Sequence, residues 1–174
     1  MKQQARTWPI PALLSGLILL TLHGAQAQES AASLCGRIGE DVMRMFEQSG
    51  DPVFASAGPA PGTFQCRWKL TDFDIGFETS VMPSIVAARG VVTDSLTGDD
   101  HIPPRATGLT GIGDAAAMRD ALDTPKPALD LLAVRGARRF VLSVHPSGRG
   151  IARHRIIVPA MSVLGRQVAS LFKH

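Results

Sequence analysis

The sequence predicts an α+β domain in which helices pack on an antiparallel sheet of about five strands. Two segments, 64–81 and 129–144, each show the pattern of two strands joined by a short turn. Two others, 30–48 and 159–171, place apolar residues at steps of three and four, which is the period of a helix. The expected order of elements, α-β-β-α-β-β-β-α, is typical of the α+β class.

The N-terminal segment 1–27 has the features of a secretory signal peptide. Lys2 and Arg6 precede an apolar run over 10–22, and small residues stand at Ala25 and Ala27, where a signal peptidase cleaves. The apolar run is shorter than the roughly 18 residues that a membrane-spanning helix needs. We therefore expect cleavage near Ala27 and export to the periplasm or beyond the cell. No stable membrane anchor is expected, and 28–174 is expected to form one domain.

Residues 30–48 predict the first helix after the leader. Its apolar stripe consists of Leu34, Ile38, Val42 and Met45. A Ser-Gly-Asp-Pro sequence over 49–52 ends this helix, because glycine tolerates the left-handed cap and proline cannot continue the helix. The segment 51–62, rich in proline and glycine, is expected to be a loop.

The alternation over 64–81 predicts a hairpin and also its register. Apolar residues occupy alternate positions on both arms, and polar or small residues lie between them. A turn at Thr71 and Asp72 would pair Leu70 with Phe73, Trp68 with Ile75, Cys66 with Phe77, Lys69 with Asp74 and Gln65 with Glu78.

Cys35 and Cys66 are the two cysteines of the chain. Both follow the predicted leader, and an even count in an oxidising compartment favours pairing. The helix that carries Cys35 would pack on the strand face to which Cys66 points. We therefore expect a disulfide between them.

The second half of the chain predicts a helix, a strand, a hairpin and a final helix. Pro83 would begin a helix over 84–96, and a loop over 97–108 would lead to a strand near 115–119. Gly136 suits the turn of the second hairpin, and Pro159 suits the first position of the last helix. The expected apolar side of the helix over 84–96 is Ile85, Val86, Val92 and Leu96. The expected pairs of the hairpin are Leu131–Leu142 and Ala133–Phe140.

The glycine-rich stretch GLTGIGDAAAMRDA covers 108–121. A phosphate-binding loop of the Walker type needs a lysine and a hydroxyl residue after its last glycine. Here Asp114 follows Gly113, and its carboxylate would repel an anion. We expect Gly111, Gly113 and Asp114 to form a structural turn with glycines at positive φ, and we expect no cofactor.

Charge is unevenly divided along the chain. Between 28 and 130 there are 15 acidic and 8 basic residues, whereas 131–174 holds 8 basic residues and no acidic ones. Either the two halves neutralise each other across one fold, or the basic half binds an anionic envelope component or an acidic protein. The second interpretation would use Arg135, Arg138, Arg139, Arg149, Arg153 and Arg155. Nucleic acid is not expected, because interleaved aromatic residues are missing from this segment.

Candidate catalytic residues lack the context of a known motif. His145 and His154 could act as bases in a hydrolase, but the sequence places no carboxylate beside either. Asp72 and Asp74 could serve a cation, although basic cross-strand partners explain them as well. The acidic segment 94–101 does not match the spacing of a calcium loop. We expect no enzyme activity and no metal site.

The order of three features resembles a known family. An early Cys35, a C-x-W sequence at 66–68 and a G-[IV]-G-D-x-A sequence at 111–116 are similar to small secreted lipoproteins of unknown function common in actinobacteria. The chain departs from them because it lacks the lipidated cysteine. The resemblance implies an exported, disulfide-stabilised α+β domain without an established activity.

Together these features predict an exported binding or accessory protein of the cell envelope. One alternative is an inhibitor or immunity-type protein that binds a secreted enzyme. A second alternative is a hydrolase that uses His145 or His154.

Overall fold

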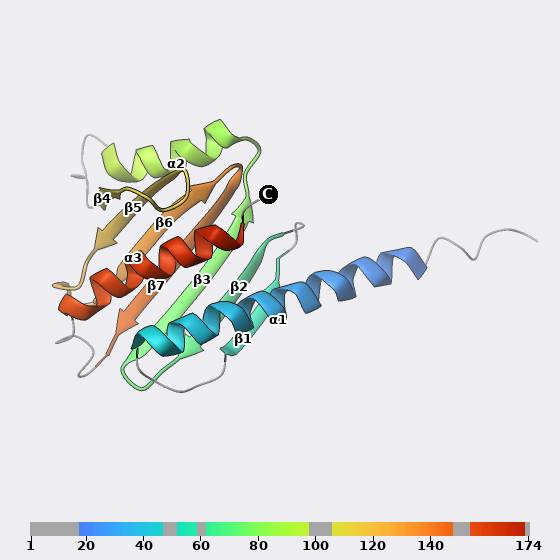
Figure 1. The fold of residues 1–174 in the computed structure, drawn as a ribbon, viewed down its shortest axis with the longest axis horizontal. Coiled ribbons are helices and arrows are strands. Elements are labelled where there is room, and N and C mark those ends of the chain that lie inside the picture. The colour runs from blue at the N-terminus through green and yellow to red at the C-terminus, as the bar shows by residue number, and fades with distance from the viewer. Residues whose placement is uncertain (1–17, 47–51, 59–61, 98–105, 148–153, 173–174) are drawn as a thin grey trace, which may run out of the picture.

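The computed structural model describes residues 18–46, 52–58, 62–97, 106–147 and 154–172. These residues form three helices and seven strands (Figure 1). In chain order the elements are α1 (Ile18–Phe46), β1 (Pro52–Ala57), β2 (Phe64–Lys69), β3 (Phe73–Val81), α2 (Ile85–Thr97), β4 (Ala106–Leu109), β5 (Ala115–Asp120), β6 (Leu129–Arg135), β7 (Arg138–Pro146) and α3 (His154–Leu171).

All seven strands belong to one antiparallel sheet, in the order β1-β2-β3-β7-β6-β5-β4. The predicted α+β class is confirmed, but the expected number of five strands is wrong. The two additional strands, β1 and β4, lie in segments that we expected to be loops. Both are edge strands with a single neighbour, and their short sequences, PVFASA and ATGL, lack the polar and apolar alternation that predicts a strand.

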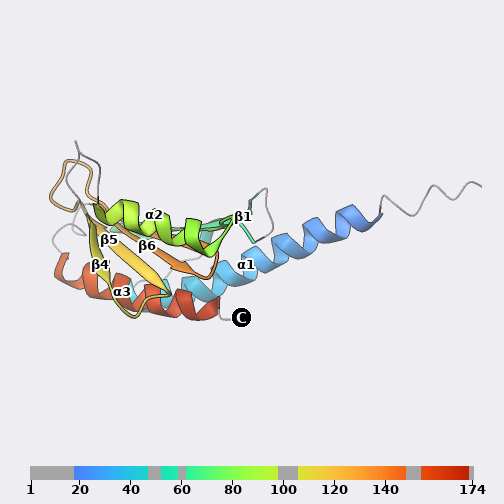
Figure 2. The same cartoon turned by 90° about the horizontal axis from the view of Figure 1, so that it is seen from above.

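The helices form two unequal layers on the sheet. Figure 2 shows α1 and α3 on one face and α2 on the other. The main core lies under α1 and α3, and its largest fully buried side chains include Trp68, Phe77, Phe140 and Met161. A smaller core under α2 consists of Ala88, Val92, Ala117 and Val134. The sheet is therefore packed more extensively on one face than on the other.

The predicted registers of both hairpins are confirmed. In the first hairpin, Cys66 pairs with Phe77, Trp68 with Ile75, Gln65 with Glu78 and Lys69 with Asp74. The backbone N–H of Leu70 donates to the carbonyl of Phe73, 2.7 Å away, and closes the turn. In the second hairpin, Leu131 pairs with Leu142 and Ala133 with Phe140. The first hairpin turns between two strongly alternating arms, and that alternation was sufficient to fix its register.

The helices differ from their predicted bounds. α1 begins at Ile18 and runs without a break through the expected cleavage position, and its first half projects beyond the sheet (Figure 1). α3 begins at His154, so Pro159 lies inside the helix rather than at its start. Burial of Ile157 in the main core holds the turn before this proline. In α2 the expected apolar side is partly wrong, because Ile85 and Val86 are exposed.

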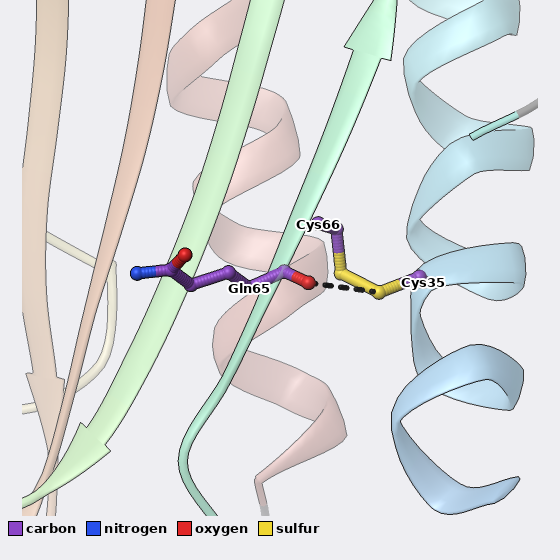
Figure 3. Close-up of a disulfide and its surroundings, with 3 residues drawn as sticks. All are labelled: Cys35, Gln65 and Cys66. Carbon is purple, nitrogen blue, oxygen red and sulfur yellow. Dashed lines mark hydrogen bonds between the residues drawn. A yellow bond between two sulfur atoms is a disulfide. The ribbon is translucent and has the colours of Figure 1, made fainter. Parts of the chain in front are cut away.

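A disulfide joins α1 to the sheet. Cys35 on α1 and Cys66 on β2 are bonded, with their Cα atoms 5.6 Å apart, and both are buried. Figure 3 shows the Cys35 sulfur beside the carbonyl oxygen of Gln65, at 3.8 Å. This is the pair that the sequence predicts.

Gly39 allows α1 to approach the sheet closely over Trp68. A Cβ atom at Gly39 would lie 2.7 Å from the indole nitrogen of Trp68, which is fully buried. A larger residue would therefore push the helix away from β2, next to the disulfide.

Loss of the disulfide is expected to destabilise the fold substantially. The bond closes a loop with a sequence separation of 31, and restricting the unfolded chain in this way contributes roughly 3 to 4 kcal/mol. Urea unfolding followed by circular dichroism should show a lower midpoint with a reductant than without it. The matched control is the double variant Cys35→Ala/Cys66→Ala, whose midpoint should not respond to the reductant. An unchanged wild-type midpoint under reduction would contradict this expectation.

Candidate functional site

One part of the sheet surface is left uncovered by the described helices. On the face opposite α1 and α3, α2 contacts β4, β5, β6 and part of β7. The remaining area, over β2, β3 and the second half of β7, contains an open hollow of about 850 Å³. Cys66 and Phe77 line it too, but both are buried in the main core. We call this area the open sheet face and define it by the remaining lining residues, which are Gln65, Arg67, Lys69, Asp74, Gly76, Glu78, Val141, Ser143 and His145.

The strand registers arrange these side chains in rows across the sheet. Alternate residues of a strand point to opposite faces of the sheet. Along the strands, cross-strand pairs that are buried in the core therefore alternate with pairs that face the hollow. One row crosses five strands and consists of Arg67, Gly76, Ser143, Asp130 and Arg119. Two shorter rows flank it: Gln65, Glu78 and Val141 on one side, and Lys69, Asp74 and His145 on the other.

The carboxylates in these rows are held by basic or amide side chains. The Arg67 guanidinium donates two hydrogen bonds to the Asp74 carboxylate, one of them from Nε to Oδ1 at 2.8 Å. Glu78 accepts hydrogen bonds from Gln65 at 3.2 Å and from Arg139 at 3.4 Å. In the central row, Nε of Arg119 donates to Asp130 at 3.0 Å. The acidic groups of this surface are therefore largely compensated before any ligand arrives.

The Arg67 contact also changes the acidity of Asp74. The hydrogen bond from Arg67 is the largest influence and lowers the pKa of Asp74, and partial burial opposes it. The charges of Arg67, His145 and Lys69 lower the pKa of this carboxyl further. The Asp74 carboxyl is therefore ionised at neutral pH and paired with Arg67.

Three polar side chains of the open sheet face keep their hydrogen-bonding capacity. Lys69, Ser143 and His145 have no hydrogen-bond or ion-pair partner among the described residues. Ser143 and His145 share a strand face, and Asp74 is the cross-strand partner of His145. Asp74 is already hydrogen-bonded to Arg67, so it is not free to orient His145 as a catalytic base. Lys69, Ser143 and His145 therefore suit hydrogen bonding to a ligand better than nucleophilic catalysis.

The structure separates the arginines that the sequence groups together. Arg135 donates to Asp114 at 3.2 Å, and Arg139 reaches Glu78 on the open sheet face. Arg138 points to the other side of the sheet, where its guanidinium lies 5.0 Å from the ring centre of Phe172. There it donates to the carbonyl of Gly62, and burial lowers its pKa. The three do not share one surface.

The other predicted basic residues are less well placed. Arg149 and Arg153 lie outside the described residues. Arg155 and His154 belong to the first turn of α3, but their side chains are outside the described part of the structure. The idea of a single arginine cluster is therefore not supported by the residues whose positions are known.

The glycine-rich stretch forms the turn between the antiparallel strands β4 and β5. Gly111 and Gly113 have φ angles of 75° and 58°, in the left-handed region. The Asp114 carboxylate accepts a hydrogen bond from the backbone N–H of Gly136 at 2.7 Å, and its own N–H donates to the carbonyl of Val134 at 2.8 Å. Asp114 thus ties the segment before β5 to the turn between β6 and β7, which is an architectural role.

Two searches of the described residues bear on other kinds of site. They contain no group of three or more histidine, cysteine, aspartate or glutamate side chains arranged to hold a metal ion. Within the same ranges, no helix combines the length and apolar character needed to cross a membrane. Of the acidic residues considered from the sequence, Asp94 is exposed on α2, and 99–101 lie outside the described residues.

Comparison of the chain with protein-family models, with curated proteins and with solved structures found no match. The resemblance to secreted lipoproteins therefore stays a prediction. Any functional conclusion has to come from the open sheet face and from the sequence.

Sequence reasoning missed most of the open sheet face. It placed Lys69 beside Asp74 and Gln65 beside Glu78, which are two edges of the site. It could not show that β7 is the other neighbour of β3, and so it did not connect Ser143 with Gly76. A hint was available in the alternation of β7, which turns Ser143 and His145 away from the core.

Gly113 is expected to tolerate substitution much less well than Gly111. A Cβ atom at Gly113 would lie 2.2 Å from the carbonyl oxygen of Val134, whereas one at Gly111 would meet nothing within 4 Å. Gly111→Ala should lose about 1 kcal/mol because of its positive φ, and Gly113→Ala about 3 kcal/mol or more because a clash is added. Thermal or urea unfolding would measure both. Equal losses would contradict the architectural role.

Arg67→Met is expected to raise the pKa of Asp74 towards its ordinary value, because the main group that stabilises the carboxylate is removed. An NMR titration of the Asp74 carboxyl would measure the change. Since the folded pKa is depressed, the stabilising effect of Arg67 is present above the ordinary aspartate pKa of about 4 and disappears as the pH falls further. Arg44→Met, which removes a pair on α1, is the control. An unchanged Asp74 pKa in Arg67→Met would show that Arg67 does not govern it.

Proposed function

We propose that this chain is a small exported binding or accessory protein of the cell envelope, and that its ligand occupies the open sheet face. The observation that carries the proposal is the hollow of about 850 Å³ on a part of the sheet that no described helix covers. Hydrogen-bonding groups on rigid strands hold their positions better than groups on loops, which favours binding.

Export is supported by the leader sequence and by the cysteines. Segment 1–27 carries the charged, apolar and small-residue regions of a signal peptide. The disulfide between Cys35 and Cys66 suits an oxidising compartment. Among the residues of α1 whose side chains the structure describes, Ala31 is the first that joins the main core. All core residues described on α1 therefore follow Ala27, and we infer cleavage there and a periplasmic or secreted product.

The pairing of charges favours binding over catalysis. A hydrolase that uses His145 would need a nucleophile and an orienting carboxylate beside it. Asp74 is the strand partner of His145, which keeps this alternative open, but its carboxylate is held by Arg67. The alternative of an inhibitor or immunity-type protein uses the same surface, with a secreted enzyme as the partner.

Retention on envelope material is expected to depend on the open sheet face. Purified mature protein should sediment with insoluble envelope fragments, and Lys69→Ala/His145→Ala should reduce the retained fraction by about tenfold, which corresponds to about 1.4 kcal/mol. Both side chains are exposed and act on Asp74 only through their charge, with no hydrogen bond or ion pair to a described residue, so the fold should be kept. Mass spectrometry of the protein recovered from expressing cells should show a chain that begins at Gln28.

The comparison variant is Arg149→Glu/Arg153→Glu, which reverses charge in the basic segment. If only this variant loses retention, the anionic-partner version is correct and the open sheet face is not the binding surface. A stoichiometric complex with one secreted enzyme would instead support the inhibitor alternative. Hydrolysis that disappears in His145→Ala would support the enzyme.

A further inference from the structure

Gly76 lies at the centre of the open sheet face, and the fold itself does not require a glycine there. It pairs with Arg67 and with Ser143 in an uninterrupted register, so no β-bulge explains it. Its φ is outside the left-handed region, unlike those of Gly62, Gly111, Gly113 and Gly136. A Cβ atom at Gly76 would meet only the Cβ of Ser143, at an ordinary contact distance of 3.9 Å.

A glycine inside a strand weakens the strand, because it adds no side-chain packing and loses more backbone entropy on folding. Such a glycine commonly marks a bulge, a tight bend or a place where a ligand or another backbone comes close. The register excludes a bulge at Gly76, and no second backbone of the described residues comes within 4 Å of a Cβ atom built there. Of the explanations that glycines inside strands share, close approach of a ligand is the one that fits the position of Gly76 over the hollow.

Gly76 and Ser143 together form the floor of a shallow trough that crosses the strands. Glu78 and Val141 border it on one side, and Asp74 and His145 border it on the other. Arg67 lies at one end, and the pair of Asp130 and Arg119 lies at the other. Since neighbouring strands are about 4.8 Å apart, the row from Arg67 to Asp130 spans about 14 Å, which accommodates an extended chain.

We propose that this trough binds a neutral, hydroxyl-rich chain, namely an uncharged polysaccharide strand, which passes over Gly76 and Ser143. This inference rests on the proposed binding function of the open sheet face. It names the chemical class of the ligand, which the proposed function leaves open.

The charge arrangement favours a ligand with little net charge, because Lys69 is the one permanently charged residue of the open sheet face that forms no ion pair with a described residue. The carboxylates of Asp74, Glu78 and Asp130 each have an arginine partner. An anionic chain would lie against these carboxylates, and a cationic chain would have to displace their arginines. A hydroxyl group both donates and accepts, so it bonds to the lone pairs and N–H groups that each ion pair leaves free. Lys69, Ser143 and His145 supply further hydrogen bonds.

Other classes of partner fit this surface less well. Cys66 and Phe77 also line the hollow, but both are buried in the main core. Among the residues that define the open sheet face none is aromatic, and Val141 is the single large apolar one. Protein interfaces depend on buried aromatic and apolar anchors. Single-stranded nucleic acid needs aromatic stacking and an excess of cations. A polar chain that lies over Gly76 and Ser143 would be held by hydrogen bonds, without apolar anchors, aromatic stacking or an excess of cations.

Gly76→Val is the variant that tests the inference. Valine fills the trough, and its preference for strands and the free space at this position mean that the fold should be kept. Isothermal titration calorimetry with cellotetraose and with tetra-N-acetylchitotetraose should detect binding to the wild type. The Gly76→Val protein should bind at least about tenfold more weakly. The wild-type affinity should change little with added salt, because no net charge is neutralised.

Gly90→Ala is the control, since a Cβ atom at Gly90 meets nothing within 4 Å and the residue lies on α2, away from the trough. It should bind like the wild type. Tetragalacturonic acid is the charged probe. Binding of this probe alone, with an affinity that falls as salt is added, would overturn the inference, as would failure of both neutral probes to bind.

The same variant distinguishes this inference from the proposed function. If Gly76→Val loses retention on envelope material while neither neutral probe binds the wild type, the open sheet face binds something else and only the ligand class is wrong. If Gly76→Val is retained as well as the wild type, the open sheet face is not the binding surface, and both proposals fail.

Discussion

The antiparallel pairing of β3 with β7 is the contact on which the rest of the structure depends. It joins the first three strands to the last four and makes one sheet of them. The same pairing places Gly76 beside Ser143 and Asp74 beside His145. Without it the chain would consist of two small sheets, and the central row of the open sheet face would not exist.

Unequal covering of this sheet creates the candidate site. Two helices pack on one face, where the disulfide and the close approach of Gly39 to Trp68 hold α1 against β2. On the other face, α2 contacts β4, β5, β6 and part of β7, and it leaves β2 and β3 open. A solvent-facing sheet surface normally carries polar residues, so polarity alone carries no functional meaning here. Gly76, the glycine in the centre of this surface that the fold does not require, is the feature that indicates a function.

Ion pairs on this sheet also account for the uneven charge of the chain. The sequence left two interpretations open, a basic surface or neutralisation across one fold. Arg135 reaches Asp114 and Arg139 reaches Glu78, so basic residues of the last part of the chain meet acidic residues of the earlier part. These contacts favour neutralisation for Arg135 and Arg139, whereas Arg138 contacts Phe172 and the Gly62 carbonyl instead. A surface compensated in this way suits an uncharged ligand better than an anionic one.

The sequence by itself determined the local pattern: the α+β class, the registers of both hairpins, the cysteine pair and the stripe of α1. Each of these follows from the spacing of side chains within a short segment. Only the tertiary structure decided that β3 pairs with β7, that β1 and β4 form the edges, and that Arg138 and Arg139 face opposite sides. A period of two tells which residues share a face of a strand, but it does not tell which strand lies next to it. The choice of neighbouring strand depends on packing between segments far apart in the chain. Only the pairing of Gly76 with Ser143 therefore indicated a role for Gly76 in binding.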